Sequence, residues 1–244
     1  MTFKFQSAEI DVNQMFGFIR RMELATSIFR RLEEELIAAI VPIPQEYIEK
    51  KVQDVLGETP EKEFLYSRGW SQADLKLHVC HQEALNMFAE QRFGPGLEEQ
   101  FLASRGAYDQ IIYSLLRVRD ASLARELWIR IEESETTFSD AAQSFGQGPE
   151  AQRKGIIGPM PIGQLSPPLI ADLLRGLSPG KISPPTSVGE WHIILRLEQL
   201  TPARFDSSMR SMLLNQSLDK FLSERVTKRL SGDHLEPLTF DLVS

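Results

Sequence analysis

Residues 189–198 read Gly-Glu-Trp-His-Ile-Ile-Leu-Arg-Leu-Glu, and residues 111–118 read Ile-Ile-Tyr-Ser-Leu-Leu-Arg-Val. The second stretch is rich in β-branched and apolar residues, and the first largely alternates apolar with polar residues from Glu190 onward, so both predict β-strands. Between them, Asp120 is placed to cap a helix through Ile131, and residues 138–145 and 168–175 predict two shorter helices. Eight of the fourteen prolines and eight of the fifteen glycines fall between Gly146 and Gly189, which predicts turns and short elements there.

The flanking regions carry helical periodicity instead. Residues 11–41 predict one long amphipathic helix, with apolar residues from Met15 to Ile40 at spacings of three and four. Shorter helices are expected at 45–56, 61–68, from Ser71 to the Gly94-Pro95-Gly96 break, and at 97–105, and a final long helix at 205–230. We expect the final helix to return to the N-terminal helices, since neither part buries its apolar stripe easily alone. The predicted fold is therefore α+β: a helical lobe at 1–107, an αβ domain at 108–202, and a returning helix with a tail at 203–244.

Composition excludes several classes of protein. The chain has 244 residues, 42% of them hydrophobic, and a formal net charge of −7, which argues against disorder and against non-specific binding to nucleic acid. The single cysteine, Cys80, cannot form an internal disulfide, and no apolar run is long enough to cross a membrane. Residues 1–10 are polar and lack the features of a secretory signal, so we expect a cytoplasmic protein.

A series of motifs in residues 109–200 resembles the parvulin family of peptidyl-prolyl cis-trans isomerases, the PpiC-like proteins. In the family's order these are the strand ending at Val118, the helix Phe138–Phe145, Gly155-Ile-Ile-Gly158, Gly163-Gln-Leu165, Leu177 to Pro185, and Gly189-Glu-Trp-His192-Ile-Ile. The helical lobe, less closely, is similar to that of SurA- and PrsA-type chaperones. The whole chain looks most similar to short bacterial parvulin-like proteins that lack an export signal.

This resemblance implies a set of site residues. Leu165 stands where the family has Met, Leu169 where it has Phe, and Ile157 at the family's Leu, so these three would bind the proline ring. His192 corresponds to the second family histidine and Ser187 to the hydroxyl residue before it. The first family histidine is replaced by Tyr113, and we expect Tyr113, His192 and Ser187 to form a hydrogen-bonded catalytic network. The family's Cys or Asp falls at Gly148 and its Asp at Ile156, so the polar centre is depleted.

Two functions follow from these residues. Rotation about an X-Pro bond meets a barrier near 18–20 kcal/mol without any bond being broken, so an apolar slot and a few fixed polar groups suffice for catalysis. The first hypothesis is a cytoplasmic isomerase and chaperone with weak activity on proline-containing polypeptides, including unfolded, precursor or secreted peptides. The alternative is a non-catalytic peptide-binding or peptide-maturation accessory protein on the same fold. Neither requires a cofactor, nucleic acid or membrane insertion, and the oligomeric state stays open.

Other patterns receive structural interpretations. His78, Cys80 and His81 lie close together, but zinc usually takes four ligands, and no metal site is predicted. No Gly-x-Ser-x-Gly elbow or Gly-x4-Gly-Lys loop occurs. The Met and Phe residues of the two long helices favour a helical core, with a groove for unfolded or leader-peptide segments as the alternative. The tail from Ser231 ends in apolar residues that suit an added strand or a partner contact.

Overall fold

The computed structural model describes residues 2–5 and 8–241, and the chain divides into two compact units. Residues Glu99–Phe205 form the first, here called the αβ unit. Residues Met1–Glu98 together with Asp206–Ser244 form the second, the helical unit. The mixed α+β class predicted from the sequence is confirmed.

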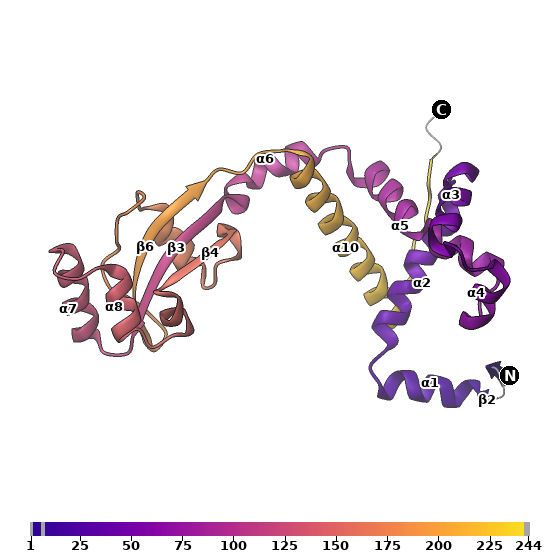
Figure 1. Cartoon of the computed structure of the whole chain (residues 1–244), viewed down its shortest axis with the longest axis horizontal. Helices are drawn as coiled ribbons and strands as arrows, with labels where there is room; N and C mark the ends of the chain where they lie inside the picture. The colour runs from indigo at the N-terminus through magenta and orange to yellow at the C-terminus, as the bar shows by residue number, and fades with distance from the viewer. Residues whose placement is uncertain (1, 6–7, 242–244) are drawn as a thin grey trace. The chain divides into compact units, whose positions relative to one another are not determined.

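A four-stranded antiparallel sheet forms the centre of the αβ unit, with strand order β4-β3-β6-β5 (Figure 1). The strands are β3 (Gln110–Val118), β4 (Ile156–Pro161), β5 (Thr186–Val188) and β6 (Trp191–Thr201). In the register of β3, Tyr113 lies opposite Ile157 of β4 and Leu197 of β6, whereas Val118 lies opposite His192 of β6. The two strands predicted from periodicity are therefore the central pair of the sheet.

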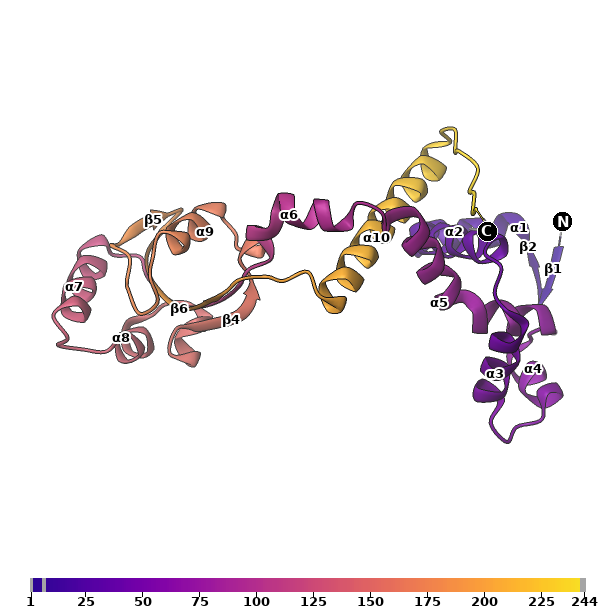
Figure 2. The ribbon, with the colours of Figure 1, turned by 90° about the horizontal axis from the view of Figure 1, so that it is seen from above.

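Each face of this sheet carries its own apolar cluster, because successive side chains of a strand point to opposite faces. On one face, here called the slot face, Tyr113, Leu115, Ile193 and Leu195 pack with α9 (Pro168–Arg175) and with Leu165. On the other face, Leu116, Val118 and Ile194 pack with α7 (Ala121–Glu132) and α8 (Phe138–Phe145) (Figure 2). Two short 3-10 turns, Pro149–Arg153 and Ile162–Gln164, complete the connections.

Local sequence explains where these elements begin and end. The Asp120 carboxylate accepts from the backbone N–H of Ser122 at 2.7 Å, so α7 begins with a capping residue as predicted. Gly155 has a φ of +84°, and a Cβ at Gly158 would lie 2.5 Å from the carbonyl oxygen of Ile111. Both ends of the Gly155-Ile-Ile-Gly158 motif thus require glycine for β4 to approach β3 closely.

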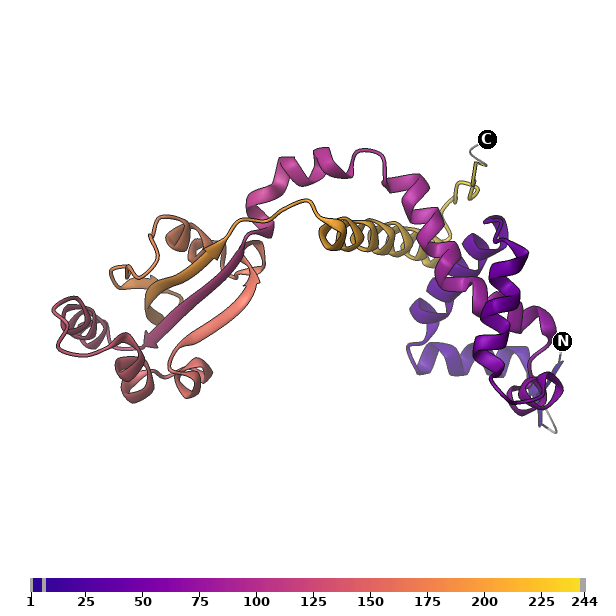
Figure 3. The same ribbon diagram turned by 45° about the horizontal axis from the view of Figure 1, so that its top comes forward.

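The helical unit is built on α2 (Ala25–Ile40), α5 (Gln72–Phe93) and α10 (Ser207–Ser231), which share one apolar core (Figure 3). Ile37 of α2, Phe88 of α5 and Leu222 of α10 are almost fully buried in it. The prediction that the final helix packs against the N-terminal helices is confirmed. A second cluster joins α5 to α3 (Gln45–Leu56) and α4 (Glu61–Arg68), and α6 (Leu97–Tyr108) follows α5 along the chain.

A buried ion cluster ties α2 to α10. The Glu33 carboxylate, fully buried, accepts from Arg225 Nε at 2.6 Å and from the Arg229 guanidinium. Arg225 also donates from Nη1 to the carbonyl oxygen of Glu236 at 2.8 Å, so the same guanidinium holds the segment after α10.

The single helix predicted over residues 11–41 is wrong. The structure has α1 (Val12–Arg21) and then α2, separated at Glu23, whose φ of +56° lies in the left-handed region. No glycine or proline marks this break, so the sequence carried no signal for it. A strand pair, β1 (Thr2–Phe5) and β2 (Ala8–Asp11), precedes α1 and was also not predicted.

The apolar residues of α1 and α2 mostly face outward. Eight exposed residues are here called the apolar stripe; six lie in these two helices and two in the turn between them, and their exposed fractions run from 36% to 57%. They are Phe16, Phe18, Met22, Leu24, Ile28, Leu32, Leu36 and Ile40. Of the Met and Phe residues predicted to form a core, Phe16, Phe18 and Met22 are exposed instead, whereas Phe221 of α10 packs against the core. Helix α1 contains no buried residue. Among the described helices, none is both long and apolar enough to cross a membrane.

Candidate functional site

Three of the predicted site residues meet on the slot face. Tyr113, only 5% exposed, lies on β3 opposite Ile157 of β4. Leu165, at the end of the 3-10 turn before α9, is buried in the same cluster, and Ile157 packs half-buried against it. Together they belong to one apolar cluster on the slot face, with Ile157 the most exposed of the three.

Leu169 has a different position. It is the second residue of α9 and is 42% exposed, and it is outside the buried cluster that contains Leu165. Its neighbour Ile170 is buried instead. Leu169 is therefore available to a ligand as a surface contact, whereas Leu165 contributes as part of the floor.

His192 and Ser187 form a pair of their own on the β5–β6 hairpin. Their residues lie opposite each other, and Ser187 Oγ is 3.1 Å from His192 Nδ1. The hairpin turn between the two strands contains only Gly189 and Glu190, and Gly189 takes a φ of +61° there. The turn thus fixes the register that brings the hydroxyl to the imidazole.

The predicted contact between Tyr113 and His192 is not formed. His192 lies opposite Val118, which is five residues farther along β3 than Tyr113, or about 16 Å at the usual rise of a strand. In addition, the neighbours of His192 on either side, Trp191 and Ile193, belong to the slot-face cluster, so His192 points to the opposite face. Strand register, which a resemblance in sequence does not define, separates the expected network into two parts.

An ion pair that the sequence analysis missed lies on the slot face, four residues farther along β3 than Tyr113. Arg117 Nε and Nη2 donate to the two oxygens of Glu150 at 2.8 and 2.7 Å, and the Glu150 residue is only 7% exposed. Arg117 is four residues from Tyr113 on the same strand and so shares the slot face with it. Its guanidinium also lies over the half-buried ring of Trp191, with 5.5 Å from Cζ to the ring centroid.

Gly148 explains how this pair fits. A Cβ at Gly148 would lie 2.1 Å from Arg117 Nε and 2.1 Å from Glu150 Oε1. Gly148 is the position at which the resemblance expects a Cys or Asp, so the ion pair occupies space that a side chain would need. The signals available in the sequence were a single arginine in an apolar strand and the Gly148-Pro149-Glu150 turn.

The Tyr113 phenol is kept protonated by its surroundings. Burial raises the pKa of Tyr113 above its ordinary value, the Glu150 carboxylate raises it further, and the Arg117 guanidinium acts in the opposite direction. Tyr113 is therefore a neutral hydroxyl at physiological pH. The slot face consequently offers an apolar floor, one neutral phenol and one guanidinium whose Nη1 takes no part in the two bonds to Glu150.

The His78–Cys80–His81 fragment is part of the helical unit's packing. The His78 ring lies 5.0 Å from the Trp70 ring and is tilted by 51° to it. Cys80 is buried, which raises the pKa of its thiol. Arg31 Nη1 lies 2.7 Å from His81 Nε2, and burial, with Arg31, lowers the pKa of His81 although Glu34 opposes this. Within the described residues, no three His, Cys, Asp or Glu side chains are grouped as a metal site would need.

Comparison with known proteins agrees with this geometry. Residues 118–198 match the Rotamase family, described as the PPIC-type PPIASE domain. The αβ unit is therefore a parvulin-type domain in sequence as well as in fold. Comparison with curated proteins gives no match to this chain.

Solved structures extend the similarity to both units. The peptidylprolyl isomerase PrsA from Bacillus anthracis is 17% identical, with a TM-score of 0.51 over 86% of this chain and 99% of that one. PrsA from Bacillus cereus is 15% identical, with a TM-score of 0.51 over 96% of this chain and 92% of that one. At these identities the likeness shows that the fold, a parvulin-type domain with a helical lobe, is shared.

Proposed function

We propose that this protein is a parvulin-like peptidyl-prolyl isomerase and chaperone that acts on proline-containing segments of unfolded or precursor polypeptides. The observation that carries the proposal is the slot face, where Tyr113, Ile157 and Leu165 belong to one apolar cluster and the Arg117–Glu150 pair lies farther along β3 on the same face. The match of residues 118–198 to the PPIC-type domain supports this assignment.

The slot would favour the twisted amide in two ways. Apolar side chains around the proline ring exclude water, which disfavours the polar planar amide relative to the twisted one. A fixed donor then stabilises the twisted form. We assign this role to Arg117, since its side chain is 27% exposed and Glu150 holds it in place through two bonds.

Tyr113 and the His192–Ser187 pair take supporting roles in this proposal. Tyr113 is too deeply buried to contact more than the proline ring, so it serves as floor. The His192–Ser187 pair is a positioning pair for the β5–β6 hairpin, because it bridges the two strands of that hairpin. This differs from the direct catalytic role that the sequence predicted for all three.

The test is NMR exchange spectroscopy on Ala-Pro and Leu-Pro peptides at substoichiometric protein. The double variant Arg117→Met/Glu150→Gln removes the pair without leaving a buried unpaired charge, and should lower the exchange rate about tenfold, the effect of one lost hydrogen bond. The control His192→Ala should leave the rate within about twofold. Peptide line broadening without exchange in the wild type would refute catalysis and leave a peptide-binding domain.

A second function is favoured by the apolar stripe of α1 and α2. Exposed apolar side chains that gather on one side of a helix mark interaction sites. Ile28, Leu32, Leu36 and Ile40 recur every four residues along α2, and the stripe offers flexible Met, Leu and Ile side chains. We propose that it holds unfolded polypeptide. The variant Leu32→Ser/Leu36→Ser should reduce suppression of aggregation of a denatured client, whereas Val55→Ser, at an equally exposed residue of α3, should not.

We also propose that the protein works in the bacterial cytoplasm. The proposal is supported by the single cysteine, Cys80, which is buried as a free thiol and requires no oxidising compartment. Fractionation of cells that express the full chain tests it, and recovery from the extracytoplasmic fraction would refute it.

A further inference from the structure

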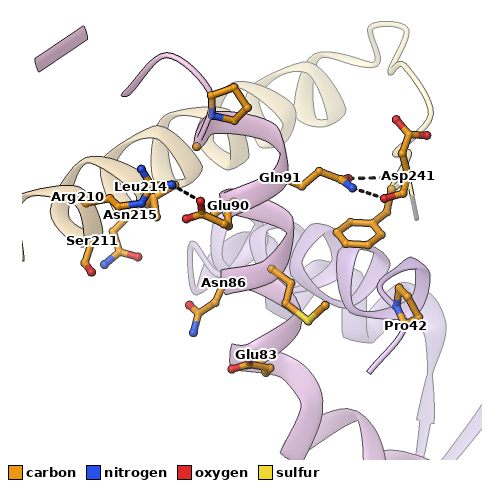
Figure 4. A pocket seen from close by; sticks show the side chains of 15 residues that line it. Pro42, Glu83, Asn86, Glu90, Gln91, Arg210, Ser211, Leu214, Asn215 and Asp241 are labelled. Atoms are coloured by element: carbon orange, nitrogen blue, oxygen red, sulfur yellow. Dashed lines mark hydrogen bonds and ion pairs between the residues drawn. The ribbon is translucent and has the colours of Figure 1, made fainter. Parts of the chain in front are cut away.

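The helical unit contains a groove between α5 and α10, with a volume of about 1220 Å³ (Figure 4). Pro42, Met87, Leu214 and Phe240 give it apolar walls, and Gln91 and Arg210 are among its polar residues. Arg210 of α10 pairs with Glu90 of α5 across it. All residues that line this groove belong to the helical unit.

One wall of the groove is formed by Phe240 and Asp241 of the chain's own segment 236–241, here called the tail segment. Arg225 Nη1 donates to the carbonyl oxygen of Glu236 at 2.8 Å, which holds the start of the segment. Leu238 and Phe240 then pack, half-buried, against the core shared by α2, α5 and α10. The tail segment has no helix or strand of its own, so these contacts position it. Residues 242–244, with the apolar Leu242 and Val243, lie outside the described residues.

Gln91 recognises the main chain of this segment. Its side-chain Nε2 donates to the carbonyl oxygen of Asp241, and its Oε1 accepts from the Asp241 backbone N–H at 3.1 Å (Figure 4). One primary amide thus satisfies both backbone groups of one residue, as a neighbouring strand would. Main-chain recognition of this type provides affinity that does not depend on the sequence of the bound segment, while side-chain pockets provide the selectivity.

We propose that this groove is a binding site for an extended polypeptide segment in which a large apolar residue takes the place of Phe240, and that the tail segment is its internal competitor. The inference rests on the proposed function only in that the protein acts on polypeptides. It adds a second site, in the helical unit. There the Gln91 side chain holds the backbone of the bound peptide, and the apolar core holds one apolar side chain of that peptide.

The experiment measures fluorescence polarisation of a labelled peptide, Gly-Ser-Gly-Leu-Thr-Phe-Asp-Gly-Ser-Gly, which lacks proline and so does not report on the proline slot. In the full chain, Phe240→Ala should release the tail segment and tighten peptide binding at least about tenfold, since a competitor at high local concentration is lost. Asp241→Pro removes the backbone N–H that donates to Gln91 Oε1, so it should also release the tail segment and tighten peptide binding. Leu230→Ala, at an exposed residue of α10, is the matched control and should leave binding as in the wild type.

Adding Gln91→Ala to Phe240→Ala should weaken the peptide by about tenfold, the effect of losing a two-point hydrogen bond. Gln100→Ala, at an exposed glutamine of α6, should have no effect. Equal binding by wild type and both tail variants, or no binding by folded variants, would overturn the proposal. A wild-type dimer that Phe240→Ala converts to monomer in sedimentation would also overturn it, and would assign the groove to the tail of a second copy. Retained isomerase activity in these variants would show that the proposed function stands independently.

Discussion

In the αβ unit the large apolar side chains are enclosed on both faces of a sheet, and those that are exposed, such as Ile156 and Leu169, lie on different elements. In the helical unit, the eight apolar residues of the apolar stripe are exposed, and the chain's own tail segment forms one wall of a groove beside α5. A closed unit with one fixed ion pair suits a reaction that needs a defined geometry. An open unit with flexible apolar side chains suits the capture of varied polypeptides. The following predictions test whether this contrast holds.

The largest effect is expected from truncating a sealed core residue. Leu127 of α7 is fully buried, so Leu127→Ala should lower the free energy of unfolding by about 3 kcal/mol. Leu32→Ala, in the apolar stripe, should lower it by less than about 1 kcal/mol, because Leu32 is already 38% exposed. Urea denaturation measures both, and equal losses would show that the stripe is a covered core.

The next largest effect is expected when the carboxylate of each buried ion cluster, Glu33 or Glu150, is neutralised. Glu33→Gln leaves Arg225 and Arg229 without their carboxylate, and should cost about 3 kcal/mol of unfolding free energy. Glu150→Gln should cost less, about 1–2 kcal/mol, since Arg117 is partly exposed to water. Glu35→Gln, at an exposed pair with Arg31, serves as the control and should stay within about 0.5 kcal/mol. If Glu150→Gln lowered the free energy of unfolding more than Glu33→Gln, the αβ unit rather than the helical unit would contain the more strongly stabilising ion cluster.

A smaller effect is expected at Gly148. Because a Cβ there would overlap both Arg117 and Glu150, Gly148→Ala should lower the free energy of unfolding by about 1–2 kcal/mol. It should also lower isomerase activity, as is expected of the double variant Arg117→Met/Glu150→Gln. Gly176→Ala is the matched control in the same unit, where the nearest atom would be 3.4 Å away. Thermal unfolding and the exchange assay compare Gly148→Ala with Gly176→Ala. If Gly148→Ala changed neither stability nor activity, the Arg117–Glu150 pair would be free to move aside.

The smallest effects concern pH. The pKa of His81 is lowered from 6.5, so the native state favours the neutral imidazole. The folded protein therefore keeps the full contribution of His81 to its stability above pH 6.5 and loses that contribution as the pH falls below that value. The pKa of Tyr113 is raised from 10.0, so its stabilisation is present below pH 10 and lost as the pH rises. Thermal unfolding across pH should therefore show an acid loss removed by His81→Gln and an alkaline loss removed by Tyr113→Phe. An acid loss unchanged in His81→Gln would contradict the first assignment.

Much of the fold could be predicted because residues at the ends of its helices carry local signals, such as capping side chains, prolines and glycines. The bounds of α8 and α9 agree with the prediction to the residue, since Thr137, Pro168 and Gly176 mark their ends. The start of α5 at Ser71 was also predicted, and the Ser71 side chain accepts there from the Asp74 backbone N–H. The break at Glu23 and the outward stripe could not be, because periodicity shows that a helix has an apolar face but not whether anything covers it.

The site was predictable only in its apolar part. Leu165, Ile157 and Tyr113 are brought together because they follow the order of the strands, which the sequence motifs define. The separation of Tyr113 from His192 depends on the β3–β6 register, and the Arg117–Glu150 pair joins residues 33 positions apart. Neither is visible in a local pattern of residues.

The space beside Gly148 has a consequence for the history of this domain. A Cβ at position 148 would overlap both Arg117 and Glu150, so in this chain a side chain there and the ion pair in its present place exclude each other. Relatives that carry Cys or Asp at the equivalent of 148 should therefore lack this arginine–glutamate combination, and those with glycine should be free to keep it. Residues 117, 148 and 150, although distant in the chain, are therefore expected to vary together, which an alignment of relatives would test.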